Sequence, residues 1–168
     1  MTEEGYSIAV FPEGTRSMDG KIGRFHKGAF MIADELNLPI VPVVIHGLHY
    51  TMSKHDYLLK NSMATLKILP KILPDDESFG VGYRERTKTI SKYFKDEYRK
   101  LADETEDARY FYPRLKSNYD YRGPMVESYF KVKFRLEKEN FDFYSTFISN
   151  EDRLIDAGCG YGYYSFFL

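Results

Sequence analysis

Two apolar runs on either side of a helical pattern constrain the fold of this chain most strongly. The first run covers residues 7–11 and ends at Pro12, and the second covers residues 40–45 and is rich in β-branched side chains. Between them, residues 28–38 carry apolar positions at the spacing of a short helix. A strand, a helix and a strand in this order predict a βαβ unit, with a parallel sheet and a right-handed crossover. The expected fold class is therefore α/β.

The rest of the chain extends this pattern. We expect a strand over residues 64–69, an amphipathic helix over residues 84–104 and a long helix from residue 126. The chain then closes with a strand over residues 153–157, a glycine-rich turn and a helix that begins at Tyr163. These last elements have the order of the first helix and strand of a Rossmann-like fold.

Composition shifts after residue 105, where aromatic and turn-forming residues become frequent. We therefore predict a first domain over residues 1–105, a linker over residues 106–122 and a second domain over residues 123–168.

Charge and cysteine content exclude several classes of protein. The formal net charge of −1 argues against a nucleic-acid partner, which requires an excess of Lys and Arg. Cys159 is the single cysteine, which excludes an internal disulfide and fits a reducing compartment. No run of about 18 apolar residues and no signal peptide is present. No cluster of residues has metal-ligand spacing, so we expect no metal.

The turn after the first apolar run has the chemistry of an anion site. Its sequence is Phe11-Pro12-Glu13-Gly14-Thr15-Arg16-Ser17, which brings backbone donors, a hydroxyl and a guanidinium together. The following loop can fold back at Asp19-Gly20 and bring Arg16 and Lys27 to the start of the next helix, where unpaired N–H groups attract anions. The alternative is that these are ordinary loop charges, with Arg16 paired to Glu13.

Three blocks of the chain resemble the glycerolipid acyltransferase family, the 1-acylglycerol-3-phosphate (lysophosphatidate) acyltransferases. The blocks read Phe11-Pro12-Glu13-Gly14-Thr15-Arg16-Ser17, Gly23-Arg24-Phe25-His26-Lys27-Gly28-Ala29-Phe30 and Leu38-Pro39-Ile40-Val41-Pro42-Val43-Val44. The resemblance runs from about Gly5 to about Pro74. It implies transfer of an acyl group from acyl-CoA or acyl carrier protein to a lysophospholipid-like acceptor, without a cofactor. It also implies that the acceptor phosphate lies at Glu13, Gly14, Thr15, Arg16 and Lys27.

The catalytic residues of that family are not found in the sequence. By the resemblance, the general base is a His followed five positions later by an Asp that orients it. His46 and His49 have no Asp at that offset, and in His55-Asp56 the two residues are adjacent. His26 lies in the phosphate block, and we do not assign it as the base. We therefore expect no catalytic residue in this chain and little activity from the chain alone.

A second motif lies near the other end of the chain. Asp156 precedes the glycine-rich turn that contains Gly158, Gly160 and Gly162, a pattern that resembles motif I of the class I S-adenosylmethionine-dependent methyltransferases. The resemblance implies that Asp156 and these glycines bind S-adenosylmethionine, because glycine lets the backbone approach a cofactor closely. The alternative is a tight turn without a ligand.

We interpret the chain as an internal fragment of a larger fused protein, with an acyltransferase half followed by the start of a methyltransferase domain. Two other interpretations remain open: a methyltransferase with a lipid-docking appendage, and a non-catalytic module that binds phosphate or a membrane surface. The expected location is cytoplasmic, or the cytoplasmic face of a membrane. Residues 126–148 could lie on anionic lipid, but packing on a sheet explains their pattern better.

Overall fold

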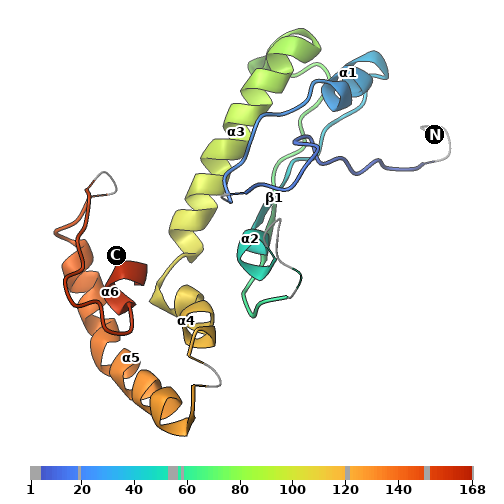
Figure 1. Cartoon of the computed structure of the whole chain (residues 1–168). Helices are drawn as coiled ribbons and strands as arrows, with labels where there is room; N and C mark the ends of the chain where they lie inside the picture. The colour runs from blue at the N-terminus through green and yellow to red at the C-terminus, as the bar shows by residue number, and fades with distance from the viewer. Residues whose placement is uncertain are drawn as a thin grey trace. The chain divides into compact units, whose positions relative to one another are not determined.

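A computed structural model describes residues 5–18, 20–52, 57, 59–119, 122–149 and 152–167. It divides the chain into two compact units. The first contains Met1–Leu58 and Ala64–Asp103, and the second contains Leu59–Met63 and Glu104–Leu168. The α-helices of both units and strand β1 are labelled in Figure 1.

The first unit contains most of the regular structure around the predicted anion site. Its elements are, in order, α1 (Gly28–Glu35), β1 (Val43–His46), α2 (Leu48–Thr51), β2 (Thr65–Ile68), the 3-10 helix η1 (Glu77–Phe79) and the long helix α3 (Gly82–Thr105), which ends at the boundary between the units. The predicted helices over residues 28–38 and 84–104 and the predicted strand over residues 64–69 are confirmed.

Helix α1 ends where the sequence predicts. Asn37 has a φ of +50°, and its N–H donates to the Asp34 carbonyl at 3.2 Å. The N–H of Leu38 donates to the Ala33 carbonyl at 2.8 Å. This pair of bonds is a Schellman motif, which Asn accommodates because its side chain tolerates the left-handed region. Pro39 then prevents the helix from continuing.

The sheet differs from the prediction. Strand β1 pairs with β2 in the antiparallel direction, from Val43 opposite Ile68 to His46 opposite Thr65. An antiparallel bridge between Ile40 and Ile72 extends the pairing. The predicted parallel βαβ unit is therefore wrong for the residues that the structure describes. Antiparallel pairing joins two segments that are close in the sequence, and it does not require the crossover connection of a parallel pair.

Residues 7–11 do not form the predicted buried strand. They belong to neither strand of the sheet, and Ile8, Val10 and Phe11 expose 58%, 52% and 77% of their surface. A strand requires a neighbour that pairs its backbone groups, and no other strand accompanies β1 and β2 in the described part of the chain. The apolar character of this run indicated burial, but the pairing partner needed to bury it is not supplied there.

Helix α3 packs one face on the core of the first unit. Ile90 is fully buried and clusters with Phe25, Phe30 and Ile72. Farther along the helix, Glu97 is also buried, and its carboxylate oxygens lie 3.2 Å from Lys67 Nζ and 2.7 Å from Lys100 Nζ. The bonds from Lys100 and Lys67 hold the pKa of Glu97 below its usual value. A buried carboxylate is thereby kept charged by two cations.

The second unit is built from α4 (Ala108–Ser117), α5 (Pro124–Ser145) and α6 (Tyr163–Phe167). Helices α5 and α6 lie side by side in Figure 1, and Tyr163 on α6 donates its hydroxyl to the Phe130 carbonyl on α5 at 2.7 Å. The predicted helices from residues 126 and 163 are confirmed, with Leu168 outside the described residues. Residues 106–122, expected as a linker, contain α4.

The predicted strand over residues 153–157 is not formed. These residues have no regular structure, and Ile155 exposes 94% of its surface. The described residues include no strand beside this segment. The first strand expected for a Rossmann-like domain is therefore absent from the described structure, because an isolated apolar segment cannot satisfy its own backbone.

No helix in the described part of the chain is long and apolar enough to cross a membrane.

Candidate functional site

The predicted anion-binding turn is tight and depends on a glycine. The N–H of Gly14 donates to the Phe11 carbonyl at 3.0 Å, and Gly14 has a φ of +69°. A Cβ at this position would lie 3.2 Å from Cδ2 of His26. The backbone conformation and the nearby ring therefore both favour glycine here.

Two blocks of sequence that lie about ten residues apart are joined at this turn. The N–H of His26 donates to the Pro12 carbonyl at 2.7 Å, and the N–H of Gly23 donates to Oε2 of Glu13 at 2.6 Å. The loop between the blocks thus folds back, although Asp19 of its predicted turn lies outside the described residues. The fold brings the Glu-Gly-Thr-Arg turn beside the segment that leads into α1.

The five residues predicted to contact phosphate have different surroundings. The carboxylate of Glu13 accepts a bond from the Gly23 backbone, so it holds the loop, and its negative charge would repel a phosphate. Thr15, Arg16 and Lys27 have exposed side chains. Arg16 and Lys27 are the predicted residues with a charge that attracts phosphate.

Lys27 occupies the N-cap position of α1, whose helical residues begin at Gly28. The first N–H groups of a helix have no partner within it and carry a partial positive charge. No side chain caps this helix start. A positively charged side chain and a helix N-terminus are therefore adjacent in the chain at this point.

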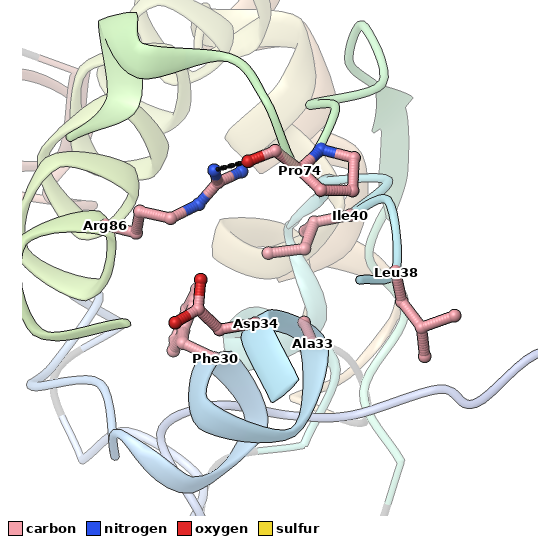
Figure 2. Close-up of a pocket in the computed structure, with 7 residues that line it drawn as sticks. All are labelled: Phe30, Ala33, Asp34, Leu38, Ile40, Pro74 and Arg86. Atoms are coloured by element: carbon pink, nitrogen blue, oxygen red, sulfur yellow. Dashed lines mark hydrogen bonds between the residues drawn. The ribbon is translucent and has the colours of Figure 1, made fainter. Parts of the chain in front are cut away.

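A small cavity lies between α1 and α3, and Figure 2 shows the residues that line it. The guanidinium of Arg86 donates to the carbonyls of Pro74 and Leu73 at 2.6 and 2.7 Å. Figure 2 also shows the Asp34 carboxylate turned toward the cavity. Its volume of about 10 Å³ is enough for about one water molecule. This cavity is structural, because no substrate would fit in it.

The glycine-rich turn of the second motif has a backbone that only glycine adopts easily. Gly158, Gly160 and Gly162 have φ values of +87°, +54° and +74°. The Asp156 carboxylate accepts a hydrogen bond from the Ser165 hydroxyl on α6. The structure thus brings Asp156 to α6, but it does not place the turn at the end of a strand.

A polar link holds α6 against α5 next to this turn. The Glu137 carboxylate on α5 accepts hydrogen bonds from Lys133, Asn140 and the Tyr164 hydroxyl on α6. The bond from Lys133, followed by those from Tyr164 and Asn140, lowers the pKa of Glu137 to about 2. This link orders the helix that follows the glycine turn.

Sequence reasoning did not identify several charged residues that the fold places in the first unit. Arg86 and Glu97 are buried, and Arg84 and Lys88 line a second cavity together with Arg24 and Lys27. The helical spacing of α3 predicted which of its positions are apolar and which are charged. It did not predict which of the charged side chains lie against another element. The pair His55-Asp56 lies outside the described residues.

Residues 1–46 match the model of the family described as Acyltransferase. A 1-acyl-sn-glycerol-3-phosphate acyltransferase of Limnanthes douglasii is 41% identical over 76 residues, which cover 45% of this chain and 27% of the relative. A chloroplastic enzyme of that name from Brassica napus is 49% identical over 47 residues, covering 28% of this chain and 14% of the relative. The human 1-acyl-sn-glycerol-3-phosphate acyltransferase alpha is 33% identical over 74 residues, which cover 41% of this chain and 26% of the relative.

The matched segment spans about a quarter of the length of the first of these relatives. No solved structure matches the chain significantly. The family-model match lies within the first unit, and it contains the joined blocks described above. The N-terminal part of this chain is therefore similar to the acyltransferase family, and the similar relatives are named as 1-acyl-sn-glycerol-3-phosphate acyltransferases.

Proposed function

We propose that the first unit is the acceptor-binding half of a lysophosphatidate-type acyltransferase of phospholipid biosynthesis. The observation that carries this proposal is the joining of two family-like blocks at one turn, through the bonds of His26 with Pro12 and of Gly23 with Glu13. The names of the similar relatives support the substrate class. The reaction would move an acyl group from acyl-CoA or acyl carrier protein to a free hydroxyl of the acceptor.

Within this proposal the site residues have separate tasks. Arg16 and Lys27 neutralise the acceptor phosphate, because a guanidinium offers a planar pair of donors and an ammonium offers a point charge. Gly14 and Thr15 shape the turn that carries Arg16. Glu13 positions the turn by accepting the Gly23 N–H. This arrangement binds a substrate, and it moves no proton.

The proposal is tested by titrating glycerol 3-phosphate into the chain and into its Arg16→Ala variant, followed by calorimetry. We expect the variant to bind about tenfold more weakly, because it loses a charge-assisted bidentate contact. Arg16→Lys keeps the charge without the fork and should lose less affinity. Lys71→Ala removes an exposed cation elsewhere in the unit and serves as the charge-matched control. Equal affinities of wild type and Arg16→Ala would refute the role of Arg16.

We also propose that this chain does not transfer an acyl group by itself. None of its four histidines, His26, His46, His49 and His55, is followed by Asp at the fifth position, the spacing that the family resemblance implies for the catalytic pair. Without a general base, the acceptor hydroxyl is a weak nucleophile toward a thioester. An assay with acyl-CoA and lysophosphatidate should give a rate equal to the protein-free background. A rate above background that is lost in a histidine variant would identify a base that we have not recognised.

A second candidate function is that of a class I methyltransferase fragment that uses S-adenosylmethionine. The observation that favours it is the run of positive φ values at Gly158, Gly160 and Gly162 before α6. The fit to the cofactor is incomplete, because residues 153–157 do not form the strand that would hold the turn in place. We therefore derive no chemical step through this cofactor.

A lysophospholipid acceptor resides in a membrane, so we propose that the larger protein works at a membrane surface on the cytoplasmic side. The acceptor headgroup would then reach Arg16 from the lipid interface. A non-catalytic phosphate-binding role for the chain would use the same residues.

A further inference from the structure

A second cavity of the first unit opens between the segment before α1 and the N-terminal half of α3. Its volume is about 190 Å³, many times the space that one water molecule needs. Its lining contains four cations, two hydroxyl groups and one aromatic ring. The lining residues are Arg24, Phe25, Lys27, Arg84, Thr87, Lys88 and Ser91. Arg16 is not one of them.

The positive charge of this cavity is not neutralised by any carboxylate among the described residues. Arg84 donates to the hydroxyl of its neighbour Tyr83 at 3.1 Å, which adds no negative charge. The side chains of Arg24, Lys27 and Lys88 make no hydrogen bond or ion pair within the part of the chain that the structure describes. The nearby carboxylate of Glu85 is turned to the backbone N–H of Val81, which it accepts at 3.1 Å. The cavity therefore has an unbalanced positive potential.

This arrangement costs stability in the absence of a ligand. Arg84 and Lys88 are four residues apart on one face of α3, and like charges at that spacing repel each other. The loop that carries Arg24 and Lys27 adds two more cations to the same cavity. The repulsion would be relieved by a bound anion.

The backbone that carries the cations is anchored by buried residues next to them. Phe25 lies between Arg24 and Lys27 in the sequence and exposes 5% of its surface. Its ring packs edge-on against Phe94 of α3, with 5.3 Å between the ring centroids. Thr87, between Arg84 and Lys88, is equally buried and donates its hydroxyl to the Tyr83 carbonyl at 2.5 Å. The two pairs of cations thus project from ordered backbone, so a ligand would have to order their side chains but not the backbone.

We propose that this cavity binds a phosphate-bearing small molecule that carries at least two negative charges. Two guanidinium groups and two ammonium groups match several phosphate oxygens better than a single carboxylate. The N-terminus of α1, next to Lys27, adds a partial positive charge. A solvent-open cavity of this volume accommodates a phosphate ester. The choice between its two sources, the nucleotide phosphates of coenzyme A and the phosphate of the lysophospholipid acceptor, rests on the proposed function.

The test compares two double variants of the full chain that remove the same charge from α3. The cavity variant, Arg84→Gln with Lys88→Gln, removes two of the four cations that line the cavity. The control variant, Lys92→Gln with Lys95→Gln, removes two exposed cations of the same helix that do not line it. Coenzyme A and glycerol 3-phosphate are titrated separately into each protein by calorimetry. We expect the cavity variant to lose about tenfold or more in affinity for at least one ligand, and the control variant to change less than twofold.

The two ligands distinguish the sources. Loss of coenzyme A binding alone assigns the cavity to the donor's phosphates, and loss of both assigns it to phosphate esters of either kind. Unchanged affinities in the cavity variant, or equal losses in the cavity and control variants, would overturn the proposal. In contrast, the proposed role of the Glu-Gly-Thr-Arg turn fails if Arg16→Ala has no effect, whatever the cavity variant does.

Thermal unfolding without ligand separates binding from folding. Because Arg84 and Lys88 repel each other, the cavity variant should be at least as stable as wild type. Coenzyme A or glycerol 3-phosphate, whichever binds, should raise the melting temperature of wild type and of the control variant but not of the cavity variant. A melting temperature of the ligand-free cavity variant well below that of wild type would contradict the assigned repulsion.

Discussion

Replacing Phe130 by Ala should lower the free energy of unfolding by about 4 kcal/mol, the largest effect that we expect from a single change. Phe130 lies on α5 and is fully buried. Its ring is 5.1 Å from Tyr119 and 5.2 Å from Tyr163, measured between centroids. Truncation would leave a cavity between α5, α6 and the end of α4, because the surrounding rings cannot all collapse into it.

Urea denaturation followed by circular dichroism measures this effect. The aromatic region is informative because the chain has 15 Tyr and no Trp, and several of these tyrosines surround Phe130. Phe130→Leu is the matched control, since it keeps most of the volume and should cost about 1 kcal/mol. If Phe130→Ala were no less stable than Phe130→Leu, the aromatic cluster would not be the core of the second unit.

Replacing Arg86 by Met should destabilise the first unit by about 2–3 kcal/mol. Arg86 exposes 5% of its surface, and its guanidinium holds the carbonyls of Leu73 and Pro74. Methionine keeps much of the side-chain length but leaves both carbonyls without their donor. These bonds tie the segment after β2 to α3, so the variant should also expose that segment to proteolysis.

Arg86→Lys is the control for charge. A lysine ammonium at the end of a flexible stem can satisfy one carbonyl well but lacks the fork that reaches both, so we expect an intermediate loss of stability. Chemical denaturation of wild type and the two variants measures their free energies of unfolding, which we expect to fall from wild type through Arg86→Lys to Arg86→Met. A Met variant as stable as wild type would mean that water replaces the guanidinium without cost.

The helices of this chain could be predicted from the sequence because their signals are local. Apolar residues at helical spacing identified α1, α3 and α5, and Asn37 and Pro39 identified the end of α1. Each of these signals lies within the element that it specifies. The tight turn at Gly14 was also readable, because a glycine between Pro12 and Arg16 favours a change of direction.

The pairing of strands could not be predicted, because it depends on residues that are distant in the sequence. The runs at residues 7–11 and 153–157 look like strands by composition, but neither pairs with a neighbour in the described structure. Strand β1 pairs with β2 in the antiparallel direction, whereas its β-branched composition suggested a parallel sheet. Composition reports a preference for extended backbone, and the partner decides whether a strand forms.

The sequence also did not predict which charged residues of the first unit lie at a cavity or in the core. Arg16 and Lys27 were recognised because they lie beside a turn with anion-site chemistry and in family-like blocks. Arg84 and Lys88 look like any solvated face of an amphipathic helix. Their position at a cavity depends on how α3 packs on Phe25 and Phe30. The same packing buries Arg86 two positions after Arg84, which helical spacing alone did not indicate.

The central claim is that the first unit recognises the phosphate of an acyl acceptor. The most direct measurement is a calorimetric titration of the full chain with glycerol 3-phosphate and, in parallel, with glycerol. We expect saturable binding of glycerol 3-phosphate that weakens as salt is added, and no binding of glycerol, because the recognised group is the charged phosphate. Absence of glycerol 3-phosphate binding at low salt, or equal binding of glycerol, would contradict it.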